Sequence, residues 1–409
     1  MFTRVESVNA PSGAASRYVD IAEGLRGKLA ETAAEVDRAG TYPEANMRLI
    51  AESGLGDLML PESAGGAAPD EPADELLALV QILKNLGAGE SSTAQIWAFG
   101  KGQSVSLTGR NSPLPEATRL KLVDEVRNEG VRFCSPQAER YKTGRFDFRV
   151  PIRRVDGGVV IDGTKYFGTG SAGAKYAHSN GLMEGFASVA EGGAYNVLVD
   201  LASEGVELHD DWDNMGQRAT GSNAITYHNV FVPDGYHWPS VDGAFTNPNN
   251  TTGIFAQFGL TSVLLGIGVG AMDALVAHLN ARATFPGVFE DTSTRYQIGL
   301  HAARLAAAEA SLMSAAAKAV DFRKNGTTPR AEVSIAGIQA KISVVEATLG
   351  IAGDMHKFLG GQSSSNIYGY DRFWRNARTL ALQDVMDVKA QQMGAWTLKN
   401  EAPPISWVS

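Results

Sequence analysis

Apolar residues recur at helical spacing in the first part of the chain. In residues 21–29 and again in residues 76–83 they return every three or four positions, which places them on one face of an α-helix. Asp70 and Pro72 are typical of a helix start, and Gly87 is typical of a helix end. The pattern predicts that this part of the chain is helical.

The pattern then changes to short runs rich in β-branched and aromatic residues, separated by turn dipeptides. Asp156-Gly157 predicts a turn between the first two runs, and Asp162-Gly163 predicts another turn directly after them. We therefore expect a compact β domain. Its predicted strands include residues 151–155, 159–161, 224–227 and 230–232.

Helical patterning returns in the last part of the chain. An Ala-rich helix is predicted from Ser293 to Lys324 and ends at Asn325-Gly326. Thr328 then caps a second helix that has Pro329 in its first turn and runs to about Leu359. Two long helices joined by a tight turn are adjacent antiparallel members of a bundle.

Residues 253–272 are uncharged and long enough to resemble a membrane span. Gln257, Thr261 and Ser262 interrupt the apolar run, which favours a buried helix of a soluble bundle. Four glycines in or near this run suit close contact between helices. They are Gly259, Gly266, Gly268 and Gly270.

These patterns predict an α+β fold that is mostly α. We expect an N-terminal helical domain over residues 1–130, a middle β-barrel-like domain over residues 131–240, and a C-terminal four-helix bundle over residues 241–409.

Charge and composition narrow the classes of function. A net charge of -9 argues against binding to nucleic acid or to an anionic membrane surface. The single cysteine, Cys134, excludes an internal disulfide framework, and the N-terminal residues lack the segments of a secretion signal, so we expect a cytoplasmic protein. The seven histidines are scattered without ligand spacing, so we expect no metal site.

The stretch 368–378 carries the most informative chemistry. It places three arginines within seven residues, next to the large aromatic residues Phe373 and Trp374, and it follows Gly360 and Gly361. Guanidinium groups hold phosphate through paired donors, aromatic faces stack on planar rings, and glycines let backbone approach a ligand. This combination favours a flat, polyanionic cofactor.

Five segments in a fixed order resemble the conserved boxes of the acyl-CoA dehydrogenase superfamily. Together they extend over most of the chain, whereas any one of them alone would be weak support. They are Pro-Glu-x-x-Gly-Gly at 61–66, Gly-x-Lys at 163–165, Gly-x-Arg-x-Thr-x-Ser at 216–222, Arg-x-x-Phe at 282–285, and Tyr-x-x-x-Arg-x-x-Arg at 368–375, with Asn376 where the superfamily has aspartate.

Within this superfamily the chain is most similar to the flavin-dependent monooxygenases typified by dibenzothiophene monooxygenase. Two strings carry that likeness, Asp-Asp-Trp at 210–212 and Asp-Arg-Phe-Trp-Arg-Asn at 371–376. The resemblance implies that Thr169 donates a hydrogen bond to the polar edge of a flavin ring, and that Trp212 stacks on the ring. It also implies that arginines hold the flavin phosphate. The implied cofactor-binding residues are Thr169, Trp212, Arg282, Gly360, Gly361, Arg372 and Arg375.

Each of these residues has a plainer alternative. Thr169 could be a solvated turn residue, and Trp212 could fill the core of the β domain. The arginines could form salt bridges between helices with carboxylates such as Asp371. Gly360 and Gly361 could serve as the C-cap of a helix, and this role is compatible with a flavin contact.

Trp97 and Phe99 lie in the predicted helical half. In the resembling monooxygenases this segment lines the substrate cavity, so the resemblance implies an apolar aromatic wall suited to a flat hydrophobic substrate. A plain stripe of core residues explains the same pattern.

Gln383 and Asp384 bear on the reaction. Many acyl-CoA dehydrogenases place a catalytic glutamate, followed by Gly-Thr, where this chain has Asp384-Val385, and a shorter carboxylate is misplaced as a base. The monooxygenases place a histidine where this chain has Gln383, whose amide donates but cannot change charge near neutral pH. The implied residues around the reacting atoms are Gln383, Asp384, Thr169 and Trp97.

We therefore predict a monooxygenase that uses O2 and reduced FMN or FAD to oxygenate a small aromatic or heteroatom-containing substrate. Sulfur or nitrogen is favoured over a phenol ring, since Gln383 gives no proton-accepting group. The sequence has no dinucleotide fingerprint, so the resemblance implies a separate NAD(P)H:flavin reductase, and it also implies a homotetramer. The alternatives are an FAD-containing acyl-CoA dehydrogenase or oxidase, and a non-catalytic helical-bundle protein.

Overall fold

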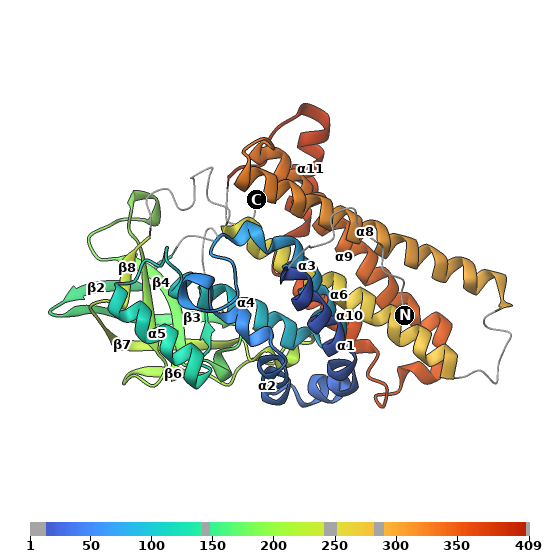
Figure 1. The fold of residues 1–409 in the computed structure, drawn as a ribbon, viewed down its shortest axis with the longest axis horizontal. Helices are drawn as coiled ribbons and strands as arrows, with labels where there is room; N and C mark the ends of the chain where they lie inside the picture. The colour runs from blue at the N-terminus through green and yellow to red at the C-terminus, as the bar shows by residue number, and fades with distance from the viewer. Residues whose placement is uncertain (1–13, 141–147, 241–251, 282–289, 406–409) are drawn as a thin grey trace.

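The computed structural model describes residues 14–140, 148–240, 252–281 and 290–405. Figure 1 shows a sheet at one side of the molecule and long helices at the other. Helices from the beginning and from the end of the chain lie together, and the sheet comes from the middle of the chain. The predicted fold class is confirmed.

The N-terminal region is helical, with short 3-10 turns between some of the helices. Its α-helices are α1 (Ala14–Ala39), α2 (Glu44–Glu52), α3 (Leu76–Gly89), α4 (Ser91–Thr108) and α5 (Glu116–Glu129).

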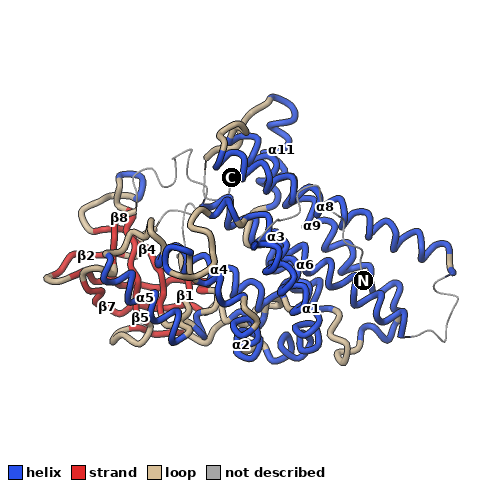
Figure 2. The backbone as a smooth tube through the Cα atoms, viewed as in Figure 1, coloured by secondary structure: helices blue, strands red, loops and turns tan. Residues whose placement is uncertain are grey.

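The middle region forms one mixed sheet, whose strands are red in Figure 2. The strand order is β6-β7-β3-β2-β4-β5-β8, and β1 pairs with β4 beside this path. The pairs β1–β4 and β2–β4 are parallel, and the other pairs are antiparallel. The strands are β1 (Phe133–Cys134), β2 (Pro151–Val155), β3 (Gly158–Gly168), β4 (Tyr176–Met183), β5 (Ala194–Asp200), β6 (Val206–Leu208), β7 (Asn223–Pro233) and β8 (His237–Pro239).

In the described part of the C-terminal region there are three long helices and two shorter ones, and α8 and α9 lie side by side in Figure 1. The turn between α8 and α9 contains Asn325 and Gly326, as predicted. The helices are α6 (Thr252–Ala281), α8 (Thr292–Lys324), α9 (Arg330–Leu359), α10 (Asp371–Ala381) and α11 (Met386–Lys399).

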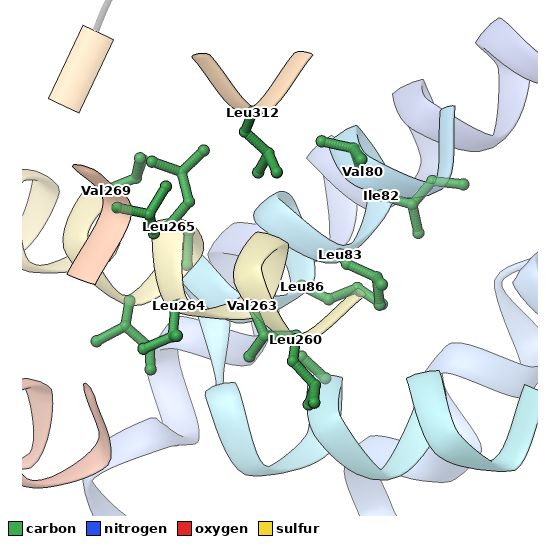
Figure 3. Packing of buried hydrophobic residues seen from close by; sticks show 14 of the residues in the cluster. Val80, Ile82, Leu83, Leu86, Leu260, Val263, Leu264, Leu265, Val269 and Leu312 are labelled. Atoms are coloured by element: carbon green, nitrogen blue, oxygen red, sulfur yellow. The ribbon is translucent and has the colours of Figure 1, made fainter. Parts of the chain in front are cut away.

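The N-terminal and C-terminal helices share one hydrophobic core. Leu83 and Leu86 of α3 belong to the same buried cluster as Leu260 and Val263 of α6, and Figure 3 shows these side chains close together. The sheet has a separate core, and a third cluster joins the sheet to α4 and α5. The two helical regions are therefore separate in sequence but continuous in packing.

Glycines let α6 approach α3 closely. A Cβ atom at Gly266 would lie 2.4 Å from the carbonyl oxygen of Lys84, and one at Gly270 would lie 2.5 Å from that of Ala88. Atoms cannot approach so closely, so these two positions require glycine. Gly259 differs, because its Cβ would meet only Leu83, at an ordinary 3.5 Å.

Two of the described helices, Gly253–Ala281 and Arg330–Leu359, are long and apolar enough to cross a membrane. In the first, 78% of the most apolar window is buried inside the protein, and in the second 56% is buried. The prediction of a buried helix over residues 253–272 is confirmed.

Several local predictions were wrong. Gly87 lies inside α3, where it packs against the backbone of Val263, and α3 begins at Leu76 after a 3-10 turn that starts at Pro72. Thr328 donates its hydroxyl to Asp321 at 2.6 Å, and Pro329 is the N-cap residue of α9.

Asp162-Gly163 does not end a strand. β3 continues through this dipeptide, with Gly163 at φ 130°, and the backbone N–H of Asn229 donates to the Asp162 carboxylate at 3.2 Å. Asn229 itself has φ 50° within β7, so the two predicted strands 224–227 and 230–232 are one bulged strand. Asp156-Gly157, in contrast, forms the predicted turn between β2 and β3.

Candidate functional site

A cluster of buried polar side chains lies where α4, the end of β3, the segment before β7 and α10 meet. We call this cluster the polar junction. Each member is at most 9% exposed, so each needs a hydrogen-bond partner within the protein. Its members are Ser91, Gln95, Thr169, Gln217, Thr220, Ser222 and Asn376.

The backbone around Thr169 has an unusual conformation. Phe167, near the end of β3, has φ 62°, and Gly170 after Thr169 has φ 78°. A left-handed conformation at a residue with a bulky side chain costs about 1–2 kcal/mol, and such strain occurs often at functional sites. Here it leaves the Phe167 ring 64% exposed while Thr169 is buried.

Trp212 borders the polar junction and contacts Phe167 edge to face, with ring centroids 6.3 Å apart. Its indole N–H donates to the carbonyl oxygen of Gln217 at 2.8 Å. Trp212 is half-buried and is not a member of the sheet core, so the alternative of a core tryptophan is wrong. Phe167 and Trp212 together provide apolar ring surface next to Thr169, whereas stacking of Trp212 on a flavin stays a prediction.

Gln217 connects the parts of the polar junction. It has φ 51° and ψ 38°, a second left-handed residue at this place. Its backbone N–H donates to Asn376 Oδ1 at 2.7 Å, and its side-chain amide bonds to Ser91 and Gln95. Gln95 Nε2 in turn donates to Thr169 Oγ1 at 3.3 Å.

A buried carboxylate lies at the start of α4. Glu90 is the N-cap residue and accepts hydrogen bonds from the backbone N–H groups of Ser92 and Thr93. Burial raises the pKa of Glu90, and these hydrogen bonds act in the opposite direction. The cap holds the N-terminal turn of α4, which carries Ser91 and Gln95.

Two of the three arginines of α10, Arg372 and Arg375, are engaged within the chain. Arg375 forms an ion pair with Asp37 at 2.5 Å and a second one with Asp371 at 2.8 Å, and it also donates to the Met215 carbonyl. Arg372 is buried and donates to the carbonyls of Tyr368 and Gly369.

Burial lowers the pKa of Arg372, and the nearby carboxylates of Asp37 and Glu90 oppose this effect. The salt-bridge alternative therefore describes Arg375, and phosphate binding by Arg372 and Arg375 stays a prediction. Arg282 lies outside the described residues.

Gly360 is the C-cap residue of α9, and its φ 74° and ψ −176° suit glycine alone. Gly361 begins the next short 3-10 turn. A Cβ atom at either position would meet nothing within 4 Å, so close packing does not explain these glycines. The C-cap role is observed, and a flavin contact stays a prediction.

Gln383 and Asp384 lie between α10 and α11. Gln383 is exposed, whereas Asp384 is buried, with its carboxylate 3.3 Å from Lys341 Nζ and 3.4 Å from Lys389 Nζ. The same two lysines line a small pocket at α6 and α9 that also includes Gln257. The two ammonium groups stabilise the charged carboxylate, so Asp384 forms ion pairs with Lys341 and Lys389.

Trp97 belongs to the shared helical core and is 2% exposed, so it is a core residue. Its indole N–H is buried and has no hydrogen-bond partner within the described part of the chain. Phe99 is partly buried at the edge of the same core. A substrate-facing role for Trp97 stays a prediction. The buried indole N–H is the group that could donate a hydrogen bond to a substrate.

No group of metal-ligating side chains occurs in residues 14–140, 148–240, 252–281 and 290–405. The polar junction suits a different kind of ligand. The Thr169 hydroxyl accepts from Gln95 Nε2 at 3.3 Å and lies 3.1 Å from Ser222 Oγ, and a hydroxyl can donate as well as accept. A donor beside the rings of Phe167 and Trp212 fits a planar molecule with acceptor atoms on its edge, as a flavin is.

The sequence prediction missed Gln95 and Gln217 as site residues. Gln217 lies inside a box that was identified, and Asn376 was noted as a departure from the superfamily aspartate. Gln95 and Gln103 are eight residues apart and so lie near one face of α4. This spacing of two glutamines could have indicated a polar face on the helix. His178 of the sheet indeed bonds to Gln103 at 2.7 Å, on the same side of α4.

Family comparisons agree with this architecture. The acyl-CoA dehydrogenase N-terminal domain model matches residues 20–107, and the acyl-CoA dehydrogenase C-terminal domain model matches residues 258–387. The two matched segments together make up more than half of the chain.

Two curated relatives align along nearly their whole lengths. Dibenzothiophene monooxygenase from Rhodococcus qingshengii is 28% identical over 418 residues, which covers 94% of each chain. The probable FMNH2-dependent monooxygenase SfnC from Pseudomonas putida is 24% identical over 416 residues, covering 98% of this chain and 100% of that protein.

A solved structure is similar in fold. The crystal structure of TdsC from Paenibacillus sp. A11-2 with FMN and indole superposes with a TM-score of 0.84 and 23% identity. The superposition covers 96% of this chain and 100% of TdsC. At this identity the likeness establishes the fold.

Proposed function

Because the chain belongs to the acyl-CoA dehydrogenase superfamily, we propose that it is a flavin-dependent monooxygenase of that superfamily. It would use O2 and reduced FMN to oxygenate a small aromatic or heteroatom-containing molecule. Two relatives that align along nearly the whole chain are named as monooxygenases, and one of these names specifies FMNH2, which supports FMN over FAD.

The observation that carries the choice of reaction is the environment of Asp384. Acyl-CoA dehydrogenation needs a carboxylate base to remove a proton next to a thioester. Asp384, at the corresponding place, faces Lys341 and Lys389, which stabilise its charge. Oxygenation makes no such demand, because a bound reduced flavin reacts with O2 and supplies one oxygen atom to the substrate while the other leaves as water.

The residues of the chain would position and shield the reaction. Thr169 would donate to the ring edge, and Phe167 and Trp212 would exclude water with their rings. Trp97 would offer its indole N–H to an acceptor atom of the substrate. Gln383 offers an amide donor without a titratable group, which favours oxygenation of sulfur or nitrogen over attack on a phenol ring.

A direct test supplies reduced FMN from an NAD(P)H:flavin reductase in isotopically labelled O2, with dibenzothiophene, indole and an alkyl sulfide as trial substrates. We expect one labelled oxygen atom in a product. The Thr169→Val variant, which keeps the shape of the side chain, should show weaker binding of FMN in an anaerobic titration.

Two outcomes would contradict this proposal. Absence of binding by both oxidised and reduced flavin would favour the non-catalytic alternative. Bleaching of bound oxidised flavin by an acyl-CoA, without oxygen transfer, would favour a dehydrogenase.

We further propose that the chain is cytoplasmic, works with a separate flavin reductase and forms a homotetramer. Apolar side chains exposed at the α10–α11 connection support self-association. These are Leu382, Val385 and Val388. Light scattering that reports a monomer would contradict the tetramer, and activity with NADH alone would contradict the need for a reductase.

A further inference from the structure

Two buried lysines lie at the small pocket between α6, α9 and α11. Lys341 of α9 is 2% exposed and Lys389 of α11 is 3% exposed, and both line the pocket. Lys389 is the one buried residue of α11, a helix that the structure describes from end to end. Lysine is rarely buried unless its ammonium group meets partners, because removing a charge from water is costly. The placement of both lysines therefore points to negatively charged or polar groups at this pocket.

Asp384 shows which chemistry these ammonium groups accept. Its Oδ2 lies 3.3 Å from Lys341 Nζ and 3.4 Å from Lys389 Nζ, so two ammonium groups meet at one carboxylate oxygen. Its other oxygen, Oδ1, accepts from the backbone N–H of Val385 at 3.1 Å. Lys341 also donates to Gln257 Oε1 at 2.7 Å. Both lysines are therefore held in place by neighbouring oxygen atoms at the wall of the pocket.

The rest of the lining is partly apolar and partly polar. Among the residues that the structure describes, the lining has two ammonium groups and no carboxylate, because Asp384 contacts the lysines without lining the pocket. A wall with cationic and apolar parts suits an organic anion, whose charged oxygens meet the ammonium groups while its tail covers the apolar side chains. The apolar side chains are Ile254, Phe258, Val333 and Ile338, and the uncharged polar ones are Gln257, Thr261 and Ser334.

We propose that this pocket binds a small organic anion, a carboxylate or an oxyanion of sulfur with a short apolar tail, whose charged oxygens lie between Lys341 and Lys389. Hydrogen bonds from an ammonium group to an oxyanion are about twice as strong as those between neutral groups. The pocket is small, so its ligand has a few carbon atoms and is not a flavin. This site goes beyond the proposed function, because binding of the anion requires no cofactor.

The pocket is connected to the segment that carries Gln383. Asp384 directly follows Gln383 between α10 and α11, and Lys389 lies in the first turn of α11. An anion between the two lysines therefore adds a contact beside this connection. The same ligand chemistry has two sources, a substrate that carries an acidic group and a separate anion that regulates the protein. Only the first of these sources rests on the proposed function.

The first measurement compares propionate with propionamide, which have nearly the same shape and differ in charge. Ligand-observed NMR titrations of the full chain, without flavin and in chloride-free buffer, give the two dissociation constants. We expect propionate to bind at least about tenfold more tightly, because the amide cannot form the charge-assisted hydrogen bonds. Equal affinities, or no saturable binding of propionate, would overturn the proposal.

Two substitutions should change the affinity for propionate in opposite directions. Lys389→Met keeps the length of the side chain and removes its charge, so affinity should fall about tenfold or more. Asp384→Asn removes the carboxylate that competes for both ammonium groups and repels the ligand, so affinity should rise about two- to tenfold. Falls of equal size in both variants would show that these residues only maintain the local structure, and would overturn the site.

Lys357→Met is the matched control, since this lysine is exposed on α9 and pairs with Asp354. Its affinity for propionate should change less than about twofold, and a loss equal to that of Lys389→Met would overturn the site. If Lys389→Met does not fold, Lys341→Met and the comparison of propionate with propionamide on the wild-type chain still decide the proposal.

A second assay identifies the source of the anion. It supplies reduced FMN and labelled O2, as for the proposed function, with (methylthio)acetate and (methylthio)acetamide as paired thioethers. Faster formation of labelled sulfoxide from the acid supports the site as the place where a substrate's acidic group binds. Equal rates, with binding of propionate retained, support a regulatory anion. Absence of flavin binding would contradict the proposed function alone, whereas absence of propionate binding would contradict the anion site alone.

Discussion

The α3–α6 contact is made of apolar side chains and closely packed helix backbone, whereas the polar junction is made of amides and hydroxyls. In the first, Leu83, Leu86 and Val263 share one core, and burial acts without direction. In the second, the backbone N–H of Gln217 and the carbonyl oxygen of Ser91 fix the orientation of the Asn376 and Gln217 side-chain amides. At the α3–α6 contact, the size and shape of a side chain therefore limit which substitutions are tolerated. In the polar junction, the limit is whether a side chain can donate or accept a hydrogen bond.

The largest effect is expected where helix backbones meet. In Gly266→Leu the new side chain would collide with the carbonyl oxygen of Lys84, because even its Cβ would lie at 2.4 Å. We expect a loss of at least about 3 kcal/mol in the free energy of unfolding, or failure to fold. Urea unfolding followed by circular dichroism measures this loss, and stability equal to wild type would contradict the α3–α6 contact.

The contact between α4 and the sheet should depend on pH. His178, bonded to Gln103 and Asn196, has its pKa lowered by burial from 6.5 to about 4. The unfolded chain takes up a proton near pH 6.5, while the folded chain resists it until about pH 4. Stability present above pH 6.5 is therefore lost as pH falls toward 4, by about 2 to 3 kcal/mol.

Urea unfolding at pH 7.5 and pH 5 measures this effect. The difference between the two pH values should shrink in His178→Gln. The exposed His228 provides the control, since His228→Gln should retain the wild-type difference. An unchanged pH dependence in His178→Gln would contradict the assignment.

A moderate effect is expected inside the polar junction. Asn376→Ala leaves the buried N–H of Gln217 without its acceptor, which costs about 1–3 kcal/mol. Thermal unfolding measures this loss. Asn128→Ala, at an exposed asparagine of α5, should change stability by less than about 0.5 kcal/mol. Equal effects of the two substitutions would remove the distinction between the junction and the surface.

The smallest effect is a gain. Gly259→Ala places a Cβ atom 3.5 Å from Leu83 Cδ1, which is an ordinary contact, and it replaces a poor helix former on α6. We expect stability to rise by about 0.5–1 kcal/mol in thermal unfolding. A loss comparable to that of Gly266→Leu would show that α6 tolerates no side chain at either glycine.

Local patterns predicted much of the fold. The spacing of apolar residues predicted long helices over residues 293–324 and 328–359. The observed helices α8 and α9 begin and end within two residues of these bounds. The errors came from signals with two meanings. Asp162-Gly163 reads as a turn, but positive φ at Gly163 also suits a bulge, and pairing with β7 selected the bulge.

The site was less predictable from the sequence. Arg375 was predicted at a phosphate, and the structure pairs it with Asp37, a residue 338 positions earlier in the chain. No local sequence pattern predicts a partner so far away in the chain. The same reason hides the role of Gln95, whose neighbours Thr169 and Gln217 lie 74 and 122 positions away.

The sequence by itself determined the order of helices and strands and the superfamily, because these follow from spacing and from short strings of neighbouring residues. Only the tertiary structure decided that Asp384 is held by two lysines and that Gln217 bonds to Asn376 and Ser91. Both facts depend on hydrogen-bonding groups brought together from distant segments. Their direction is set by backbone N–H and C=O groups whose partners become defined once α4, α10 and the sheet have docked.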